Sequence, residues 1–187
     1  YPSLAIVDGH PAIAYYDATN TELKYVRADD AGGAAWGAPL TADGTGVVGQ
    51  YASLAVVNGR PAIASFDDIN GDLVYVRASN VDGSAWGAPV TPDNDFAVVG
   101  WYASLAVINA RPAGAYYDDT NDDLKYVRAS DADGAAWEVP VTPDSIGDVG
   151  SHASMALVNG RPAIAYYDRS NGDLKYVRAA DADGAAW

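Results

Sequence analysis

The feature that most constrains the fold of this sequence is a fourfold internal repeat. Serines recur 50, 51 and 50 residues apart, at Ser3, Ser53, Ser104 and Ser154. Tryptophans keep the same spacing, at Trp36, Trp86, Trp137 and Trp187. A unit that recurs in this register is one supersecondary structure used four times, whose apolar faces are buried by stacking on neighbouring units. We therefore predict one domain made of units 1–50, 51–101, 102–151 and 152–187, standing alone or within a longer array.

Each unit has the sequence pattern of four short β-strands. In the second unit, two apolar segments flank Asn58-Gly59, a pair suited to the positive φ angles of a type I′ hairpin turn. Asp8-Gly9 and Asn159-Gly160 repeat this turn, whereas Asn109-Ala110 is a poorer version of it. An acidic turn then leads into a third strand, and an Asp/Gly loop opens a fourth strand at the tryptophan.

The strands are apolar on both faces, as in AIAYY at residues 12–16, so each small sheet must be covered on both sides. Four-stranded units of this length that pack face to face around an axis form a β-propeller. We predict an all-β propeller of four blades, the last of which lacks most of its fourth strand. Closure by four blades is the first expectation, since hemopexin-type propellers are similar in length. An eight-bladed ring of two chains, or assembly by strand donation, is the alternative.

The charge of the chain argues against two classes of partner. Eleven Lys and Arg stand against 25 Asp and Glu, for a net charge of −14, which disfavours nucleic acid and anionic membranes. There is no run of 18 apolar residues, so no membrane insertion is expected. The absence of cysteine excludes disulfides, thiolate metal sites and a cysteine nucleophile.

The loop before each tryptophan carries a family resemblance. SDADGAAW at residues 130–137 resembles the Asp-box of sialidase-like propellers, a Ser-x-Asp-x-Gly-x-x-Trp hairpin between the third and fourth strands of a blade. All four copies keep the Gly-x-x-Trp spacing, but the acidic residues fall one place either side of the Asp-box aspartate. The repeat array is also similar to lectin-like bacterial propellers. Both resemblances imply a propeller fold.

The same resemblance raises the question of catalysis. Sialidases use three arginines, a Tyr/Glu nucleophile pair and an Asp acid/base. Most arginines of this chain recur in every unit, as Arg77 and Arg128 do, which indicates a structural role such as pairing with a neighbouring Asp loop; only Arg169 is unrepeated. Glu22 and Glu138 lie in different units and do not form the carboxylate pair of a glycosidase. We therefore expect no enzymatic activity, because an enzyme would need a converged cluster of unrepeated polar groups near the axis.

Two acidic loops are candidates for calcium. Hard cations prefer several oxygens from one tight turn. The loops offer two carboxylates each, from Asp131 and Asp133 and from Asp181 and Asp183. The alternative is that these aspartates stabilise their turns by accepting backbone hydrogen bonds. No other cofactor is predicted.

A recognition surface is predicted where the copies differ most. The turns between the second and third strands and the segments between blades emerge on one face of a propeller. Candidate ligand-binding residues in the inter-blade segments are Tyr51, Trp101, Tyr102 and His152, with Phe96 nearby. Those in the acidic turns are Asp67, Asp118, Asn121, Asp168 and Asn171. Aromatic rings beside carboxylates suit sugars, although the position of Tyr51 also suits core packing.

These observations lead to one predicted function and two alternatives. We expect a non-catalytic recognition or scaffold propeller, secreted or displayed on a bacterial surface, that binds a glycan or a protein. The first alternative is a structural subunit that forms homo-oligomers or filaments through its open terminal blade. The second is a fragment of a sialidase-like glycoside hydrolase.

Overall fold

The computed structural model describes residues 1–94 and 97–187; Phe96 therefore lies outside the described residues. The first sheet contains β1 (Ser3–Val7), β2 (His10–Asp17), β3 (Glu22–Arg27) and β4 (Leu40–Asp43). The second contains β5 (Val48–Val57), β6 (Arg60–Asp67), β7 (Asp72–Arg77) and β8 (Val90–Asp93). The third contains β9 (Val99–Ile108), β10 (Arg111–Asp118), β11 (Asp123–Arg128) and β12 (Val141–Asp144). The fourth contains β13 (Val149–Val158), β14 (Arg161–Asp168) and β15 (Asp173–Arg178).

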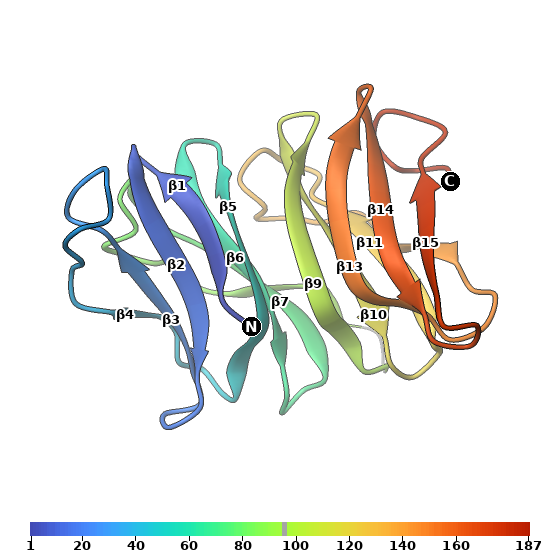
Figure 1. Ribbon diagram of the computed structural model, residues 1–187, viewed down its shortest axis with the longest axis horizontal. Helices are drawn as coiled ribbons and strands as arrows, with labels where there is room; N and C mark the ends of the chain where they lie inside the picture. The colour runs from blue at the N-terminus through green and yellow to red at the C-terminus, as the bar shows by residue number, and fades with distance from the viewer. Residues whose placement is uncertain (95–96) are drawn as a thin grey trace.

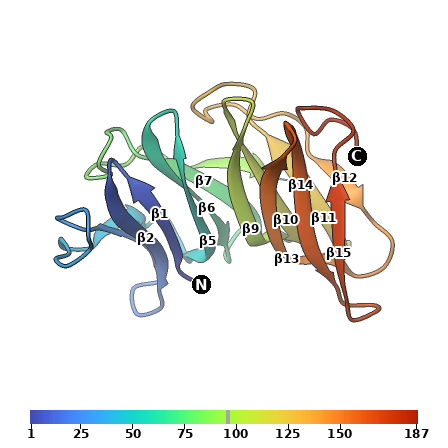
Figure 2. The same ribbon diagram turned by 45° about the horizontal axis from the view of Figure 1, so that its top comes forward.

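The sheets confirm the predicted repeat of antiparallel meanders. Each sheet keeps its strands in chain order, and the fourth sheet has three strands where the others have four. The sheets stand side by side, with the first and last at opposite ends of the row (Figures 1 and 2). The first strands β1, β5, β9 and β13 face the middle of the assembly and contact one another in sequence. No helix in the described part of the chain is long and apolar enough to cross a membrane.

The hairpins at one end of the blades have the predicted turn geometry. Both central residues have positive φ in each copy, for example 46° at Asn58 and 74° at Gly59. Glycine adopts this conformation without steric cost, so the Asn-Gly and Asp-Gly pairs fix the strand register locally. In the third blade, Ala110 holds a φ of 61° despite its side chain.

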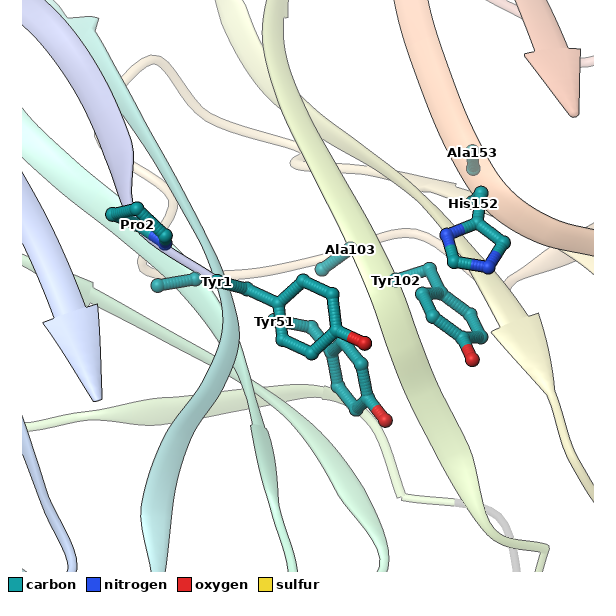
Figure 3. Close-up of a pocket in the computed structure, with 8 residues that line it drawn as sticks. Tyr1, Pro2, Tyr51, Tyr102, Ala103, His152 and Ala153 are labelled. Atoms are coloured by element: carbon teal, nitrogen blue, oxygen red, sulfur yellow. The ribbon is translucent and has the colours of Figure 1, made fainter. Parts of the chain in front are cut away.

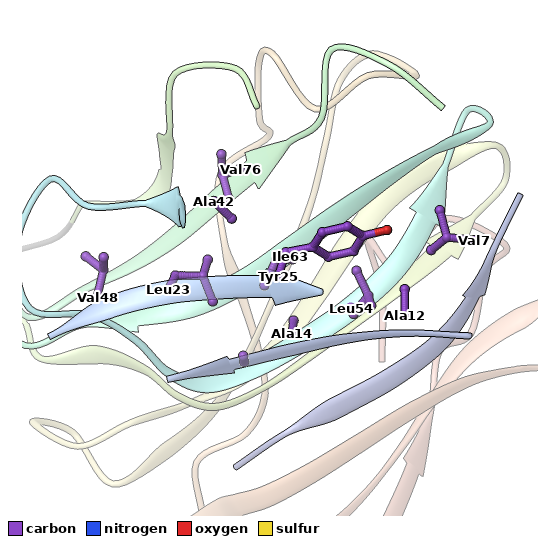
Figure 4. Close-up of a cluster of buried hydrophobic side chains, with 11 residues drawn as sticks. Val7, Ala12, Ala14, Leu23, Tyr25, Ala42, Val48, Leu54, Ile63 and Val76 are labelled. Carbon is purple, nitrogen blue, oxygen red and sulfur yellow. The ribbon is translucent and has the colours of Figure 1, made fainter. Parts of the chain in front are cut away.

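The hydrophobic core lies between neighbouring sheets. One cluster joins the first and second blades and includes Leu23 and Tyr25 from β3 with Leu54 and Ile63 from β5 and β6 (Figure 4). Equivalent clusters join the second to the third blade and the third to the fourth. The apolar character of both strand faces is thus explained, because each inner blade is covered on both sides.

The four blades do not close into a ring. Leu4 in β1 and Leu174 in β15 are 66% and 82% exposed, whereas their counterparts in the inner blades are buried. The expectation that four blades close by themselves is therefore wrong. The apolar pattern could not reveal this, because the residues of the two uncovered faces are the same as those of the covered ones.

Two of the repeated arginines, Arg77 and Arg128, join one blade to the next, as predicted. Arg77 in β7 contacts Asp133 of the third blade at 3.1 Å, and Arg128 in β11 contacts Asp183 of the fourth at 3.0 Å. The Nε atom of each also donates to a hairpin carbonyl of its own blade, that of Val57 or Ile108. Their recurrence is explained by this structural role.

Candidate functional site

In the second, third and fourth blades, a bulge in the first strand turns one bulky side chain toward the middle of the molecule. In β5, β9 and β13, the pairing register shifts near Tyr51, Tyr102 and His152. These residues have φ angles of 55°, 56° and 56°, in the left-handed region that side-chain-bearing residues rarely adopt. Such strain persists only where the surrounding structure enforces it, and it is common at functional sites.

Together with Tyr1, the bulged residues line a pocket where the first strands of the four blades lie next to one another; we call it the axial pocket. The pocket holds about 250 Å³ and is completed by the small residues that follow each ring: Pro2, Ala52, Ala103 and Ala153. Neighbouring rings are 4.6 Å apart for Tyr1 and Tyr51, 4.6 Å for Tyr51 and Tyr102, and 4.1 Å for Tyr102 and His152. Figure 3 shows Tyr1, Tyr51, Tyr102 and His152 as a continuous row of rings.

Trp101 packs behind this row. Its ring stacks on Tyr51 at 5.6 Å and meets Phe66 edge-on at 5.7 Å. Burial, together with the neighbouring phenols Tyr102 and Tyr1, raises the pKa of Tyr51 to about 12. Tyr51 therefore keeps its proton at neutral pH and presents a hydroxyl, which both donates and accepts hydrogen bonds.

A charged cluster adjoins the pocket at the junction of the third and fourth blades. It consists of Tyr117, Asp122, Asp148 and Arg169, and Tyr102 belongs both to it and to the pocket. The Tyr117 hydroxyl lies 2.8 Å from Oδ1 of Asp122 and 2.9 Å from Oδ1 of Asp148. The guanidinium of Arg169 sits 4.9 Å from the centre of the Tyr117 ring and 3.9 Å from Oδ2 of Asp148. The second guanidinium nitrogen of Arg169 donates to the Tyr102 hydroxyl at 3.3 Å.

The cluster holds more acceptors than its phenol can serve. A phenol has one hydrogen to donate, but two carboxylates approach the Tyr117 oxygen. Burial and both carboxylates raise the pKa of Tyr117 well above its ordinary value, so the phenol keeps its proton. The side chains of Asp148 and Arg169 are about one-third exposed and can be reached by a ligand.

Three members of this cluster have no counterpart in the other blades. Asp122 corresponds to Thr21, Gly71 and Gly172. Asp148 corresponds to Val47 and Val98, and Arg169 to Ala18, Asp68 and Asp119. Matching backbone hydrogen bonds support this alignment: Asp68, Asp119 and Arg169 donate to the carbonyls of Val47, Val98 and Asp148, respectively.

The sequence predicted only part of this site. Tyr51, Tyr102 and His152 line the pocket as a group, whereas Tyr1, Tyr117, Asp122 and Asp148 were missed. Comparing the copies position by position would have singled out Asp122 and Asp148, in the same way that it singled out Arg169. Their meeting could not be read from the sequence, because they come from three separate turns.

The predicted aspartates and asparagines of the acidic turns bond within those turns. Asp118 accepts the amides of Thr120 and Asn121, and its other oxygen accepts the Asn121 side chain at 2.8 Å. Asp67 makes the same bonds with Ile69 and Asn70, and Asp168 bonds the amide and side chain of Asn171. We therefore leave Asp67, Asp118, Asn121, Asp168 and Asn171 out of the candidate site, and their contact with a ligand stays a prediction.

The acidic loops do not fit a calcium ion. The carboxylate of Asp131 accepts four backbone amides, from residues 133–136, and that of Asp181 accepts those of residues 183–186. Asp133 and Asp183 are paired with arginines of the preceding blade. Within the described ranges there is no group of three or more His, Cys, Asp or Glu side chains placed to hold a metal. The geometry favours the alternative, in which these aspartates stabilise their loops.

Comparison with known proteins shows that this chain shares its fold with several hydrolases. No family model matches the sequence, and no curated protein matches it. Solved structures match over most of the chain. A GH62 α-L-arabinofuranosidase catalytic domain from Coprinopsis cinerea has a TM-score of 0.63 at 15% identity, covering 94% of this chain and 62% of the other. An exo-β-1,3-galactanase from Phanerochaete chrysosporium has a TM-score of 0.66 at 12% identity, covering 96% and 47%.

A Trypanosoma rangeli sialidase mutant with trans-sialidase activity matches as well, with a TM-score of 0.55 at 16% identity, covering 95% of this chain and 37% of the sialidase. These neighbours establish the predicted β-propeller fold, including its likeness to sialidases. The chain spans less than two thirds of the length of each of these three proteins.

The comparison also corrects the predicted function. The expectations of no enzymatic activity and of a non-catalytic recognition or scaffold module are corrected, because several solved structures that share this fold are glycoside hydrolases. Nothing in the comparison supports a polymerising subunit. The second alternative, a fragment of a sialidase-like glycoside hydrolase, agrees with this shared fold. Glu22 and Glu138 lie in different blades, whereas two aspartates, Asp122 and Asp148, approach the same phenol oxygen.

Proposed function

We propose that this chain carries the axial site of a glycoside hydrolase, in which the pocket binds a sugar and the charged cluster cleaves its glycosidic bond. The observation that supports this proposal is the convergence of Asp122, Asp148 and Arg169 beside the axial pocket. A residue type that appears in one blade only is not needed to build a blade. Three such residues meeting in one partly exposed place therefore favour a function particular to that place.

The pocket has the chemistry of a sugar-binding site. The rings of Tyr51, Tyr102 and His152 offer apolar faces against which the CH groups of a pyranose or furanose can pack. The phenol hydroxyls at the ring edges can exchange hydrogen bonds with sugar hydroxyls. Such a site combines apolar area with a few polar groups that fix the orientation of the ligand.

The carboxylate pair suits hydrolysis with retention of configuration. The Oδ1 atoms of Asp122 and Asp148 both lie within 2.9 Å of one phenol oxygen. They are therefore closer together than the roughly 6.5–9.5 Å that inverting glycosidases need to admit a water molecule. In a retaining reaction, one carboxylate attacks the anomeric carbon while the other group, as a carboxylic acid, protonates the departing oxygen. That second group, now a carboxylate, then takes a proton from the water that hydrolyses the glycosyl-enzyme and frees the sugar.

Arg169 distinguishes the two carboxylates. Its guanidinium is next to Asp148 and stacks on Tyr117, so that a positive charge accompanies the Asp148 carboxylate. We assign Asp148 as the nucleophile and Asp122 as the acid. The loops before each tryptophan, which resemble the Asp-box, have a structural role in this proposal. A glycan substrate agrees with secretion or surface display, which stays a prediction.

The proposal is tested by hydrolysis of a panel of aryl glycosides, including arabinofuranosides, galactosides and sialosides. We expect turnover of at least one substrate, and a loss of about 100-fold or more in kcat/KM in Asp148→Asn. Asp119→Asn is the matched control, because it makes the same charge change on an exposed residue of the same face. An Asp119→Asn loss equal to that of Asp148→Asn, or no turnover of any substrate, would contradict the proposal.

A further inference from the structure

The first and last blades each leave one face uncovered that is covered elsewhere in the molecule. In the first three blades, Leu23, Leu73 and Leu124 are at most 1% exposed, but the equivalent Leu174 of the fourth blade is 82% exposed. Tyr25, Tyr75 and Tyr126 are at most 2% exposed, but the equivalent Tyr176 is 59% exposed. We call this surface of the fourth blade, centred on Leu174 and Tyr176, the outgoing face.

The first blade shows the opposite half of the same interface. Leu54, Leu105 and Met155 are at most 8% exposed in their blades, whereas the equivalent Leu4 is 66% exposed. Trp86, Trp137 and Trp187 each meet a tyrosine of the preceding blade edge-on at 5.1–5.2 Å. Trp36 is 39% exposed. We call the surface centred on Leu4 and Trp36 the incoming face.

The three internal junctions specify what an outgoing face binds. The hydroxyls of Tyr25, Tyr75 and Tyr126 donate to the carbonyls of Asp82, Asp133 and Asp183 in the next blade, at 2.8–3.0 Å. The glycine after each of these aspartates lies flat on the tyrosine ring: a Cβ atom on Gly83, Gly134 or Gly184 would be only 2.5–2.6 Å from a ring carbon. A side chain at this point would separate the blades.

A second glycine makes the same kind of contact at the leucine. A Cβ atom on Gly49, Gly100 or Gly150 would lie 2.7–2.8 Å from the Cα atom of Leu23, Leu73 or Leu124. An element that covers Leu174 and Tyr176 in the same way must therefore present one glycine to the leucine and another to the tyrosine, with a tryptophan edge-on to the tyrosine ring. These are the surface features of a blade of this repeat.

From this match we infer that a single further blade of the same repeat packs between the fourth and first blades, and that its two faces cover the outgoing and incoming faces. One face of such a blade presents glycines and a tryptophan, which fit the outgoing face. Its other face presents a leucine and a tyrosine, which fit the incoming face. A second copy of the chain is disfavoured as the occupant, because it would bring another net charge of −14 against this one. The inference is independent of the proposed hydrolase activity.

The test is to extend the chain by one repeat and to measure which side chains become protected. A copy of residues 138–187 appended after Trp187 keeps the 50-residue spacing, and it supplies both the fourth strand of the last blade and one further blade. Hydroxyl-radical footprinting then reports on Leu174 and Tyr176, with Leu124 and Tyr126 as internal standards for full burial. It also reports on Leu4 and Trp36, with Leu54 and Trp86 as their standards.

We expect the reactivity of all four residues to fall to that of their standards. The matched control carries Gly150→Leu and Gly184→Leu in the appended copy alone, and it should leave Leu174 and Tyr176 as reactive as in the unextended chain. A second variant places a copy of residues 102–151 before Tyr1, so that the result does not depend on how one extension folds.

Three results would overturn the inference. The first is that Leu174 and Tyr176 stay reactive in both extended chains. The second is that only one of the two faces becomes protected, because a single blade would then not bridge them. The third is that the unextended chain dimerises in light scattering with both faces already protected, which would make a second copy the occupant.

Discussion

The two ends of the blades use charged residues in different ways. At the hairpin end, Arg77 and Arg128 recur in register, lie in the junctions between blades and contact an aspartate of the next blade at about 3 Å. At the other end, Arg169 has no counterpart, stacks on Tyr117 and stands farther from its carboxylate partner, Asp148. In a repeat protein, a charge that recurs is explained by the architecture. A charge that departs from the repeat needs another explanation, and here it lies beside a pocket.

The largest effect is expected from a substitution at the end of the blades that carries the unrepeated charged residues. Asp122→Asn should lower kcat by roughly 100- to 10,000-fold, because the acid that protonates the leaving group is lost. The loss in kcat/KM, which reports the glycosylation step alone, should be small for a dinitrophenyl glycoside, whose leaving group needs little protonation, and large for an alkyl glycoside. Steady-state kinetics on both substrates measure this difference. An equal loss on both would contradict the role of Asp122 as the acid.

A substitution of a recurring arginine at the hairpin end should change stability and not activity. Arg128 is 4% exposed and contacts Asp183 and Glu138 besides the carbonyl of Ile108. Arg128→Met should lower the free energy of unfolding by about 2–3 kcal/mol, because it removes a charged hydrogen bond and leaves a buried carbonyl unpaired. Urea denaturation measures this loss, while kcat/KM per folded molecule should stay within about twofold. A large fall in kcat/KM at unchanged stability would reverse the roles of the two ends.

The junction of the first and second blades also departs from the repeat, but the candidate functional site does not lie there. It therefore separates the effect of a broken repeat from the effect of the site. Tyr116 and Tyr166 donate to Asp93 and Asp144 of the preceding blade at 2.6 Å. At the equivalent position of the second blade stands Ser65, and both its hydroxyl and the Oδ2 atom of Asp43 are buried without a hydrogen-bond partner.

Restoring the repeat at this junction should stabilise the chain. Ser65→Tyr places a phenol within reach of Asp43 and should add about 1 kcal/mol to the free energy of unfolding. That gain corresponds to a rise of roughly 2–4 °C in Tm. Ser65→Phe is the control that adds the ring without the hydroxyl, and it should stabilise less. A lower Tm for Ser65→Tyr than for the native chain would show that the neighbouring side chains already fill the space.

The smallest effect concerns the hairpins. Ala110 has a φ of 61° where the other three blades have glycine. Ala110→Gly should stabilise the chain by up to about 1 kcal/mol, since it relieves the steric cost of the left-handed conformation. Gly59→Ala should destabilise the second hairpin by a similar amount, and thermal unfolding measures both. Equal Tm values for Ala110→Gly and the native chain would argue that this hairpin is not strained.

The repeat predicted the strands, the turns and the junction arginines because each depends on local chemistry that occurs several times. The Asn58-Gly59 turn and the pairing of Arg77 with an Asp loop are examples. It could not predict the ring opening, since Leu4 and Leu174 have the same sequence surroundings as their buried counterparts. The charged cluster was missed for a different reason: Asp122, Asp148 and Arg169 are brought together by the packing of the third blade on the fourth.

The most direct test of the central claim is to trap the glycosyl-enzyme. An activated 2-deoxy-2-fluoro glycoside, chosen to match the substrate found in the hydrolysis panel, slows the release step and leaves the sugar on the nucleophile. Peptide mapping by mass spectrometry then locates the label. Our account predicts one sugar per chain on Asp148, no labelling of Asp148→Asn and full labelling of Asp119→Asn. A label on a carboxylate outside the cluster of Asp122, Asp148 and Arg169 would contradict it.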